Sequence, residues 1–208
     1  MEVLKVDLQN EDEVAFAVRR VSEVLRVGGV VMHPTDTCYG LAVDVFNEKG
    51  LRRLYEIKGR DFNKPVSVMV ASVDDAHFIA KFSDKAEELA NRFLPGALTL
   101  VLPVIEGKLP EFFNNGMDAV GIRVPDYDFV RRMLVVFGGV LTTTSANVAG
   151  NDEVYVVEDF LEQIKCIDGI FPDLVIDVGR IEKRLPSTIV SVRGDVLVLL
   201  RQGGIVLE

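Results

Sequence analysis

Hydrophobic and polar positions follow two distinct periods along this chain. Residues 3–8 alternate as in an edge strand. Asn10 with Glu13 forms a capping pair in front of a helix whose apolar positions recur every three or four residues. Apolar runs over residues 30–32 and 39–45 then predict two strands joined by a polar loop.

The alternation of strands and helices continues to the end of the sequence. Further strands are predicted over residues 66–71, 97–104, 119–124, 140–144 and 174–178, followed by a hairpin over 187–192 and 196–200. Further helices are predicted over residues 48–57, after Ser72 and Ser83, and over 126–136 and 157–164. Because short hairpins coexist with helical crossovers, we expect an α/β fold with a mixed parallel and antiparallel sheet flanked by helices. No linker or repeat interrupts the pattern, so residues 1–208 are expected to form a single domain.

Composition indicates the size of the core, the cellular location and the cysteine chemistry to expect of this domain. With 49% hydrophobic residues, 208 residues are ample for one core. The apolar runs are shorter than the roughly 20 residues of a membrane-spanning helix, and the N-terminus lacks the pattern of a secretion signal. We therefore expect no membrane association and a cytoplasmic location. The two cysteines, Cys38 and Cys166, are spaced neither as a disulfide framework nor as metal ligands, so no protein-held metal is expected.

Charge and missing motifs argue against several functions. A formal net charge of -9 does not predict nonspecific binding of nucleic acid, which requires many neutralised phosphates. The sequence contains neither a Walker-type phosphate loop nor a dinucleotide-binding glycine motif, so any nucleotide must be bound by another arrangement. Zinc-protease and hydrolase motifs are also missing, and the only histidines, His33 and His77, are interpreted as structural.

A basic segment follows the helix predicted over residues 48–57. Lys58, Arg60 and Lys64 gather three cations around Gly59. One interpretation is an anion site, because Arg offers a planar fork to phosphate or carboxylate and Lys a compact charge. The other is a solvated helix C-terminus, where cations interact favourably with the helix dipole. The pattern alone favours the solvated interpretation and leaves both open.

Two polar segments lie next to predicted strands. Residues 142–147, which include Thr143, Ser145 and Asn147, follow an apolar run directly, and residues 34–37 include Thr35. Such side chains either hold a polar ligand or stabilise local turns and caps. Because ligands of α/β sheets usually bind near strand ends, we expect these segments and the basic one to converge on one cleft.

Two arginines raise the question of a buried charge. Arg123 lies in an otherwise apolar strand, and Arg201 follows another. A buried guanidinium needs a partner, which is either a substrate carboxylate or an acidic residue in a structural ion pair. The sequence leaves both alternatives open.

Taken in order, short segments of the chain resemble the YrdC-like threonylcarbamoyl-AMP synthase family, in its single-domain form, over nearly the whole length. These segments are residues 34–41, 58–65, 95–102, 121–125, 145–147, 187–190 and 200–204. Each segment alone is weak evidence of the resemblance, whereas the whole set in this order is specific to the family. Met69 departs from some longer members of the family, which have His at that place.

The resemblance implies a nucleotidyltransferase that combines L-threonine, bicarbonate and ATP into threonylcarbamoyl-AMP and pyrophosphate, with Mg2+ accompanying the nucleotide. A downstream threonylcarbamoyl transferase complex would then modify an adenosine of tRNA. The resemblance also implies a twisted sheet with a positive concave groove, so contact with tRNA or double-stranded RNA is a further expectation.

The same resemblance implies roles for individual residues. Lys58 and Arg60 would be catalytic. The residues that would bind the nucleotide are Lys58, Arg60, Lys64, Ser145, Asn147, Ser187 and Arg201. Thr35, Arg123 and Thr143 would bind L-threonine, with Arg123 pairing with its carboxylate.

Two other functions stay open at this point. One is a noncatalytic RNA-binding or assembly module of the same fold, which would show a steep salt dependence. The other is a relative that processes carbamoyl phosphate and keeps the nucleotide site.

Overall fold

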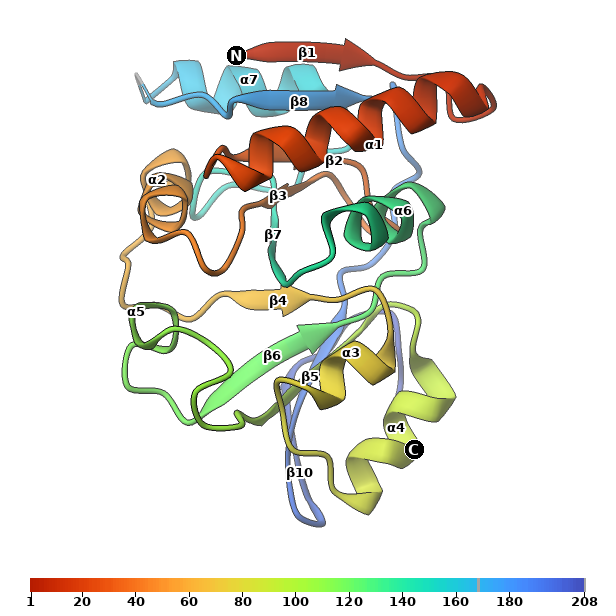
Figure 1. Ribbon diagram of the computed structural model, residues 1–208, viewed down its shortest axis with the longest axis vertical. Helices are drawn as coiled ribbons and strands as arrows, with labels where there is room; N and C mark the ends of the chain where they lie inside the picture. The colour runs from red at the N-terminus through yellow and green to blue at the C-terminus, as the bar shows by residue number, and fades with distance from the viewer. Residues whose placement is uncertain (168, 208) are drawn as a thin grey trace.

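The computed structural model describes residues 1–167 and 169–207, and its strands form one ten-stranded sheet (Figure 1). The strands are β1 (Glu2–Lys5), β2 (Val31–His33), β3 (Gly40–Ala42), β4 (Ser67–Met69), β5 (Leu98–Pro103), β6 (Ala119–Arg123), β7 (Leu141–Ser145), β8 (Leu174–Asp177), β9 (Thr188–Arg193) and β10 (Val196–Arg201). Their order across the sheet is β1-β8-β2-β3-β7-β4-β6-β5-β9-β10. Strand β1 therefore lies at an edge, as its alternating pattern predicted.

The sheet is mixed, as predicted. Parallel pairs join β1 to β8, β8 to β2, β4 to β6, and β5 to β9. The central run β2-β3-β7-β4 is antiparallel, and so are the β6–β5 and β9–β10 pairs. The first antiparallel pair, β2–β3, is joined by the segment that contains Thr35, so that segment lies at one end of the central strands.

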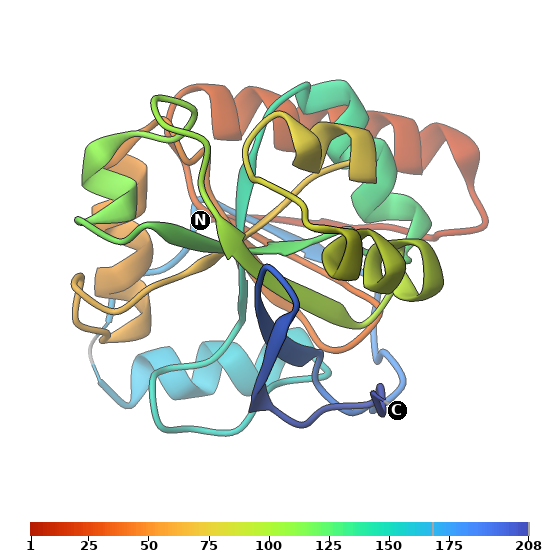
Figure 2. The ribbon, with the colours of Figure 1, turned by 90° about the horizontal axis from the view of Figure 1, so that it is seen from below.

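Helices surround this sheet and confirm the predicted α/β fold. They are α1 (Glu11–Arg26), α2 (Glu48–Lys58), α3 (Val73–His77), α4 (Asp84–Phe93), α5 (Glu111–Asn114), α6 (Asp128–Phe137) and α7 (Val157–Lys165). The capping pair in front of α1 is confirmed, because the Asn10 side chain accepts from the backbone N–H groups of Asp12 and Glu13 and donates to the Glu13 carboxylate. Figure 2 shows α1 and α6 along one side of the molecule and α7 on the opposite side.

Two apolar clusters hold the layers together. One packs α1 and α6 against the sheet through residues such as Leu25, Phe129 and Leu141. The larger cluster joins α2, α4 and α7 to the sheet and includes Leu54 and Phe160. Burial of this apolar surface is the main contribution that favours the folded chain.

Three elements differ from the sequence prediction. Strand β4 covers only Ser67–Met69 of the strand expected over residues 66–71. The strand expected over residues 39–45 is confined to β3, since Asp44 forms only an isolated bridge and its carboxylate accepts the N–H of Phe46 as the chain turns toward α2. Helix α5 was not predicted, because four residues after Pro110 are too few to show a helical period.

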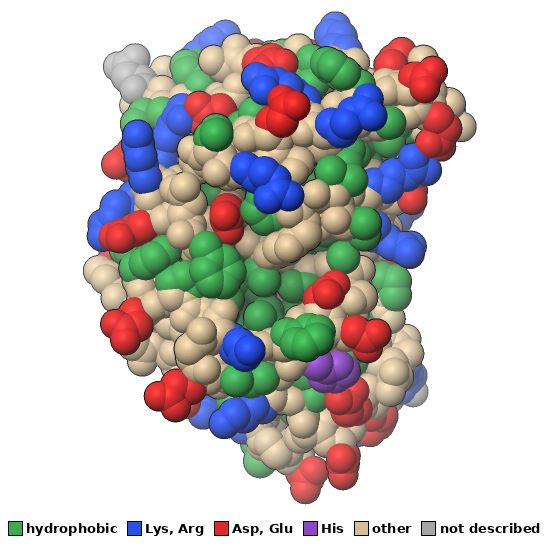
Figure 3. Space-filling model, in the orientation of Figure 1, with side chains coloured by type: hydrophobic (Ala, Val, Ile, Leu, Met, Phe, Trp, Pro, Cys, Tyr) green, Lys and Arg blue, Asp and Glu red, His purple; other side chains and the backbone are tan. Residues whose placement is uncertain are grey.

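The surface carries mixed charge. On the face drawn in Figure 3, Lys and Arg side chains are interspersed with Asp and Glu. Among residues 1–167 and 169–207, no helix has the length and apolar character needed to cross a membrane.

Candidate functional site

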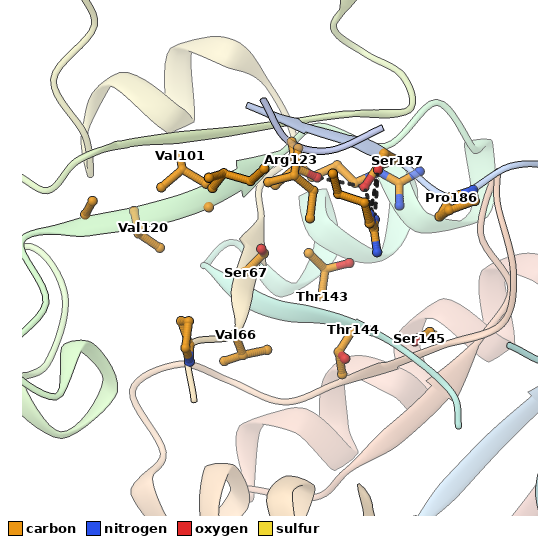
Figure 4. Close-up of a pocket in the computed structure, with 18 of the residues that line it drawn as sticks. Val66, Ser67, Val101, Val120, Arg123, Thr143, Thr144, Ser145, Pro186 and Ser187 are labelled. Carbon is orange, nitrogen blue, oxygen red and sulfur yellow. Dashed lines mark hydrogen bonds between the residues drawn. The ribbon is translucent and has the colours of Figure 1, made fainter. Parts of the chain in front are cut away.

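A cavity of about 650 Å³ opens over the middle of the sheet, which is within the usual range for small-molecule sites. Most of the expected site residues line it, namely Thr35, Arg60, Arg123, Thr143, Ser145, Ser187 and Arg201. Figure 4 shows Arg123 and Ser187 on one wall, with Thr143, Thr144 and Ser145 of β7 across from them. Lys58, Lys64 and Asn147 are not among the residues that line the cavity. The expected convergence of the polar segments on one cleft is therefore observed for these lining residues.

Strand register brings the wall residues together. Thr143 on β7 pairs with Ser67 on β4, and Ser145 pairs with Gly40 on β3. A side chain at Gly40 would meet the Thr144 carbonyl oxygen at 3.2 Å, so glycine allows β3 and β7 to approach closely here.

Lys58 is buried at the C-terminal end of α2 and faces the loop after β7. Its Nζ donates to the carbonyl oxygens of Ser145 at 2.5 Å and Asn147 at 2.9 Å, and to Asn147 Oδ1 at 3.2 Å. Burial, followed by the charge of Arg60, lowers the pKa of Lys58 to about 8, so the ammonium form still predominates at pH 7. All three of its N–H donors are engaged, which means that Lys58 holds the Ser145–Asn147 loop in place.

Arg60 and Lys64 lie on the other side of the Gly59 turn. Gly59 has φ of +56°, a left-handed conformation that closes α2 and separates the directions of its two neighbours. The Arg60 Nη2 donates to the Pro65 carbonyl oxygen at 2.7 Å, and no acidic side chain among the described residues pairs with it. Lys64 is exposed. The solvated interpretation is therefore wrong for Lys58, whereas Arg60 lines the cavity and both interpretations stay open for Lys64.

Arg123 has an acidic residue as a partner, which is one of the two kinds of partner that the sequence left open. Its Nη2 donates to Asp36 at 2.7 Å, and both side chains are buried. Its Nη1 lies 3.3 Å from Thr37 Oγ1, and its Nε lies 3.4 Å from the Gly96 carbonyl oxygen. The buried charge thus has a structural ion-pair partner. Since a guanidinium carries five N–H donors, one remains on each terminal nitrogen.

Thr35 is both a turn residue and a wall residue. Its hydroxyl donates to the Cys38 carbonyl oxygen at 2.6 Å and accepts from the N–H groups of Thr37 and Cys38. The turn interpretation of residues 34–37 is therefore correct, and the same turn presents Thr35 and Cys38 to the cavity. Burial raises the pKa of Cys38 to about 12, so its thiol is neutral and a poor nucleophile.

Arg201 is fixed by Ser187. The Arg201 Nε and Nη2 donate to the Ser187 carbonyl oxygen at 3.0 and 2.8 Å, and Nη2 also donates to the Ser187 hydroxyl. That hydroxyl lies 3.0 Å from Thr99 Oγ1 on β5. Arg201 as a whole is exposed, and partial burial of its guanidinium lowers its pKa. The chain between β8 and β9 thus orients a cation that comes from the edge strand.

Three residues noted in the sequence lie outside the cavity lining. Met69, beside Arg123 in the register, is buried in the cluster under α1 and α6. His33 is fully buried, its Nδ1 is 3.0 Å from the Pro34 carbonyl oxygen, and burial lowers its pKa to about 4. His77 bonds Glu87 at the surface. The structural interpretation of both histidines agrees with these contacts.

Sequence reasoning missed two features of the site. It gave Arg123 an acidic partner only as an alternative and did not identify Asp36. It also missed Glu153, a wall residue from the loop that follows Asn147. An acidic residue in a polar loop gives no sequence signal, because only the fold turns it toward the cavity.

Comparison with known proteins gives consistent matches. Residues 23–203 match the Sua5/YciO/YrdC family model, which carries the description "Telomere recombination". A protein from Methanocaldococcus jannaschii is 33% identical over 99% of this chain and 95% of its own length. A protein from Pyrococcus abyssi named threonylcarbamoyl-AMP synthase is 34% identical over 93% of this chain, which spans only 56% of that relative.

A solved structure agrees with these sequence relatives. The crystal structure of Pyrococcus abyssi Sua5 complexed with L-threonine has a TM-score of 0.86 at 29% identity, covering 98% of this chain and 58% of the Sua5 chain.

Proposed function

Because the chain belongs to the Sua5/YciO/YrdC family, we propose that it is an L-threonylcarbamoyladenylate synthase of the nucleotidyltransferase class. It joins L-threonine, bicarbonate and ATP into threonylcarbamoyl-AMP, with release of pyrophosphate and water. The observation that carries this proposal is the cavity that gathers Arg60, Arg123 and Arg201 with a row of hydroxyls. Three fixed cations suit a site where an amino-acid carboxylate and a polyphosphate meet.

L-Threonine binds at the Arg123 end of the cavity. The Asp36 carboxylate holds Arg123 in position, and the two remaining N–H donors on its terminal nitrogens receive the threonine carboxylate. Thr143 on β7 lies across from Arg123 and offers a hydroxyl. Thr35 shapes this end of the cavity, because its hydroxyl donates to Cys38 and accepts from the N–H groups of Thr37 and Cys38 within its own turn. Met69 contributes no contact, since it does not line the cavity.

ATP binds between Arg60, Ser145 and Arg201, which line the same cavity. Ser187 orients Arg201, and Lys58 with Asn147 keeps the loop of Ser145 in shape. Lys58 is thus a positioning residue, while Arg60 contacts the phosphates. Lys64 contributes charge from outside the cavity. Mg2+ arrives with ATP and neutralises part of the phosphate charge.

The reaction needs positioning and charge neutralisation. The threonine amine adds to carbon dioxide formed from bicarbonate, with loss of water, and gives a carbamate. A carbamate oxygen then attacks the α-phosphorus of ATP, the bond to the β-phosphate oxygen breaks, and pyrophosphate leaves. Two anions meet in this step, so Arg60 and Arg201 lower its barrier by offsetting their charges, and Mg2+ bound to ATP would supply further positive charge. No covalent intermediate with the protein is required.

The product is then passed to a downstream threonylcarbamoyl transferase complex that modifies tRNA. A direct contact with tRNA or double-stranded RNA, a single-domain organisation of residues 1–208 and a cytoplasmic location remain predictions. The RNA-module alternative has less support, because the net charge is -9 and the face in Figure 3 carries interspersed charges.

Mass spectrometry of the product tests this function. The purified protein is incubated with ATP, Mg2+, L-threonine and carbon-13-labelled bicarbonate, and L-serine replaces L-threonine in a control. We expect threonylcarbamoyl-AMP that carries one labelled carbon. In the control with L-serine, we expect the serine analogue of this product in much smaller amounts. An unlabelled product, or none while ATP binds, would contradict the proposal.

A further inference from the structure

Two carboxylates line the cavity, and their surroundings differ. Asp118 is exposed and forms a double hydrogen bond with Arg193, at 2.6 and 2.8 Å. Glu153 is half-buried, and its carboxylate has neither a hydrogen bond nor an ion pair with any residue in 1–167 and 169–207. An unpaired carboxylate in the wall of a small-molecule site is free to contact whatever the site binds.

Glu153 is held close to the residues that the proposed function assigns to ATP. The carbonyl oxygen of the next residue, Val154, accepts the Tyr39 N–H at 3.1 Å and so anchors this loop beside β3. Burial lowers the pKa of both Lys58 and Arg201, and the negative charge of Glu153 counteracts that effect at each of them. The carboxylate therefore lies within electrostatic range of the two sides of the nucleotide site.

A polyphosphate bound in this cavity would face a negative charge at Glu153. Two like charges a few ångströms apart repel each other, and the repulsion is stronger near a protein surface than in bulk water because the effective dielectric constant is lower. A divalent cation between them turns this repulsion into attraction. Mg2+ is usually bound in proteins by one or two carboxylates together with substrate phosphates and water.

The described residues contain no group of three or more side chains that could bind a metal by themselves. Phosphate oxygens must therefore supply the other ligands. We propose that Glu153 contacts the Mg2+ that arrives on ATP, directly or through one water, so that the cavity selects MgATP over metal-free ATP. This inference rests on the proposed nucleotide site.

The test compares ATP binding with and without the metal. Isothermal titration calorimetry measures ATP affinity in Mg2+ and in excess EDTA, without threonine, for the wild type, Glu153→Gln and Asp152→Asn. Asp152 is the adjacent exposed acid that does not line the cavity, and its substitution removes the same charge. Circular dichroism confirms that each variant is folded.

We expect opposite shifts for Glu153→Gln. Its affinity for metal-free ATP should rise by at least about threefold, because repulsion is lost, and its affinity for MgATP should fall by a similar factor. Asp152→Asn should behave like the wild type. The electron paramagnetic resonance spectrum of Mn2+ bound with ATP should also differ between the wild type and Glu153→Gln.

Three outcomes would overturn the inference. If Glu153→Gln changes both affinities in the same direction, Glu153 acts on the nucleoside or on the general field. If it changes neither, Glu153 has no contact with the metal. If the wild type binds ATP in neither form, the proposed function fails and the inference fails with it.

Discussion

Lys58 and Arg60 are two residues apart, yet their side chains have different surroundings. Lys58 is buried and donates to three oxygens of Ser145 and Asn147, at the end of β7 and in the loop after it, whereas Arg60 is partly exposed and lines the cavity. The Gly59 turn between them produces this division. Residues with the same charge in one short motif therefore carry out different tasks, one on the loop and one on the ligand.

Substitution of these two residues by methionine should separate the tasks. Lys58→Met leaves part-buried oxygens of Ser145 and Asn147 without donors, so we expect the free energy of unfolding to fall by about 1–3 kcal/mol together with ATP affinity. Arg60→Met should leave stability within about 0.5 kcal/mol of the wild type. Its ATP affinity should fall about tenfold, because a hydrogen bond to a charged group contributes about 1.5–3 kcal/mol.

Urea unfolding and calorimetric titration with MgATP measure both quantities. Arg19→Met, at an exposed arginine of α1, is the matched control and should change neither. Wild-type ATP affinity in Arg60→Met would contradict the assignment of Arg60. Unchanged stability in Lys58→Met would contradict the role of Lys58 in holding the loop.

Residue types were easier to predict than residue surroundings. The sequence identified Arg123 as a buried charge because apolar residues surround it in a strand. It did not identify Asp36 as the partner, since 87 positions separate the two side chains. For Thr35 the sequence allowed either a turn residue or a ligand-facing residue. Its hydroxyl bonds within its own turn, and the residue also lines the cavity.

At the scale of elements, helix α2 determines where the basic segment lies. Its N-cap is Asn47, whose side chain accepts the Gly50 N–H, and its C-cap is Gly59 in the left-handed conformation. Helix α6 ends in the same way at Gly138, with φ of +70°. Gly59 and Gly138 are therefore equivalent C-caps in the left-handed conformation. Only Gly59 adjoins the cavity, because the next residue, Arg60, lines it.

Alanine at these two glycines should have equal effects on stability and unequal effects on function. A methyl group would fit at both positions, because its nearest neighbour is 3.9 Å away at Gly59 and nothing lies within 4 Å at Gly138. The cost is the left-handed backbone, so urea unfolding should show a loss of about 1 kcal/mol in each. Only Gly59→Ala should weaken MgATP binding in calorimetric titration. Equal ATP affinities in the two variants would show that the turn does not position Arg60.

Most elements were predicted from the sequence because their periods are local properties. The capping pair at Asn10, the edge position of β1 and the final hairpin are examples. The shortened β3 and the helix α5 were not predicted, since the first depends on how Asp44 meets β7 and the second spans only four residues. The strand order was not predictable either, because long-range pairing determines it.

At the scale of the whole molecule, the cavity is assembled from segments far apart in the chain. Residues 35, 60, 123, 145, 187 and 201 meet there because β3, β7, β4, β6, β5, β9 and β10 are successive neighbours in the sheet. The family resemblance predicted which residues belong to the site. The fold explains why some of them line the cavity and others support the residues that do. Glu153 joined the set only through the fold.

The central claim is that this cavity combines three substrates, and pyrophosphate release tests it most directly. Purified protein is supplied with MgATP, L-threonine and bicarbonate, and each substrate is omitted in turn. We expect pyrophosphate release only when all three substrates are present. Release should be strongly reduced in Arg60→Met and should equal that of the wild type in Arg19→Met. Release that continues without threonine or bicarbonate, or full release by Arg60→Met, would contradict the account.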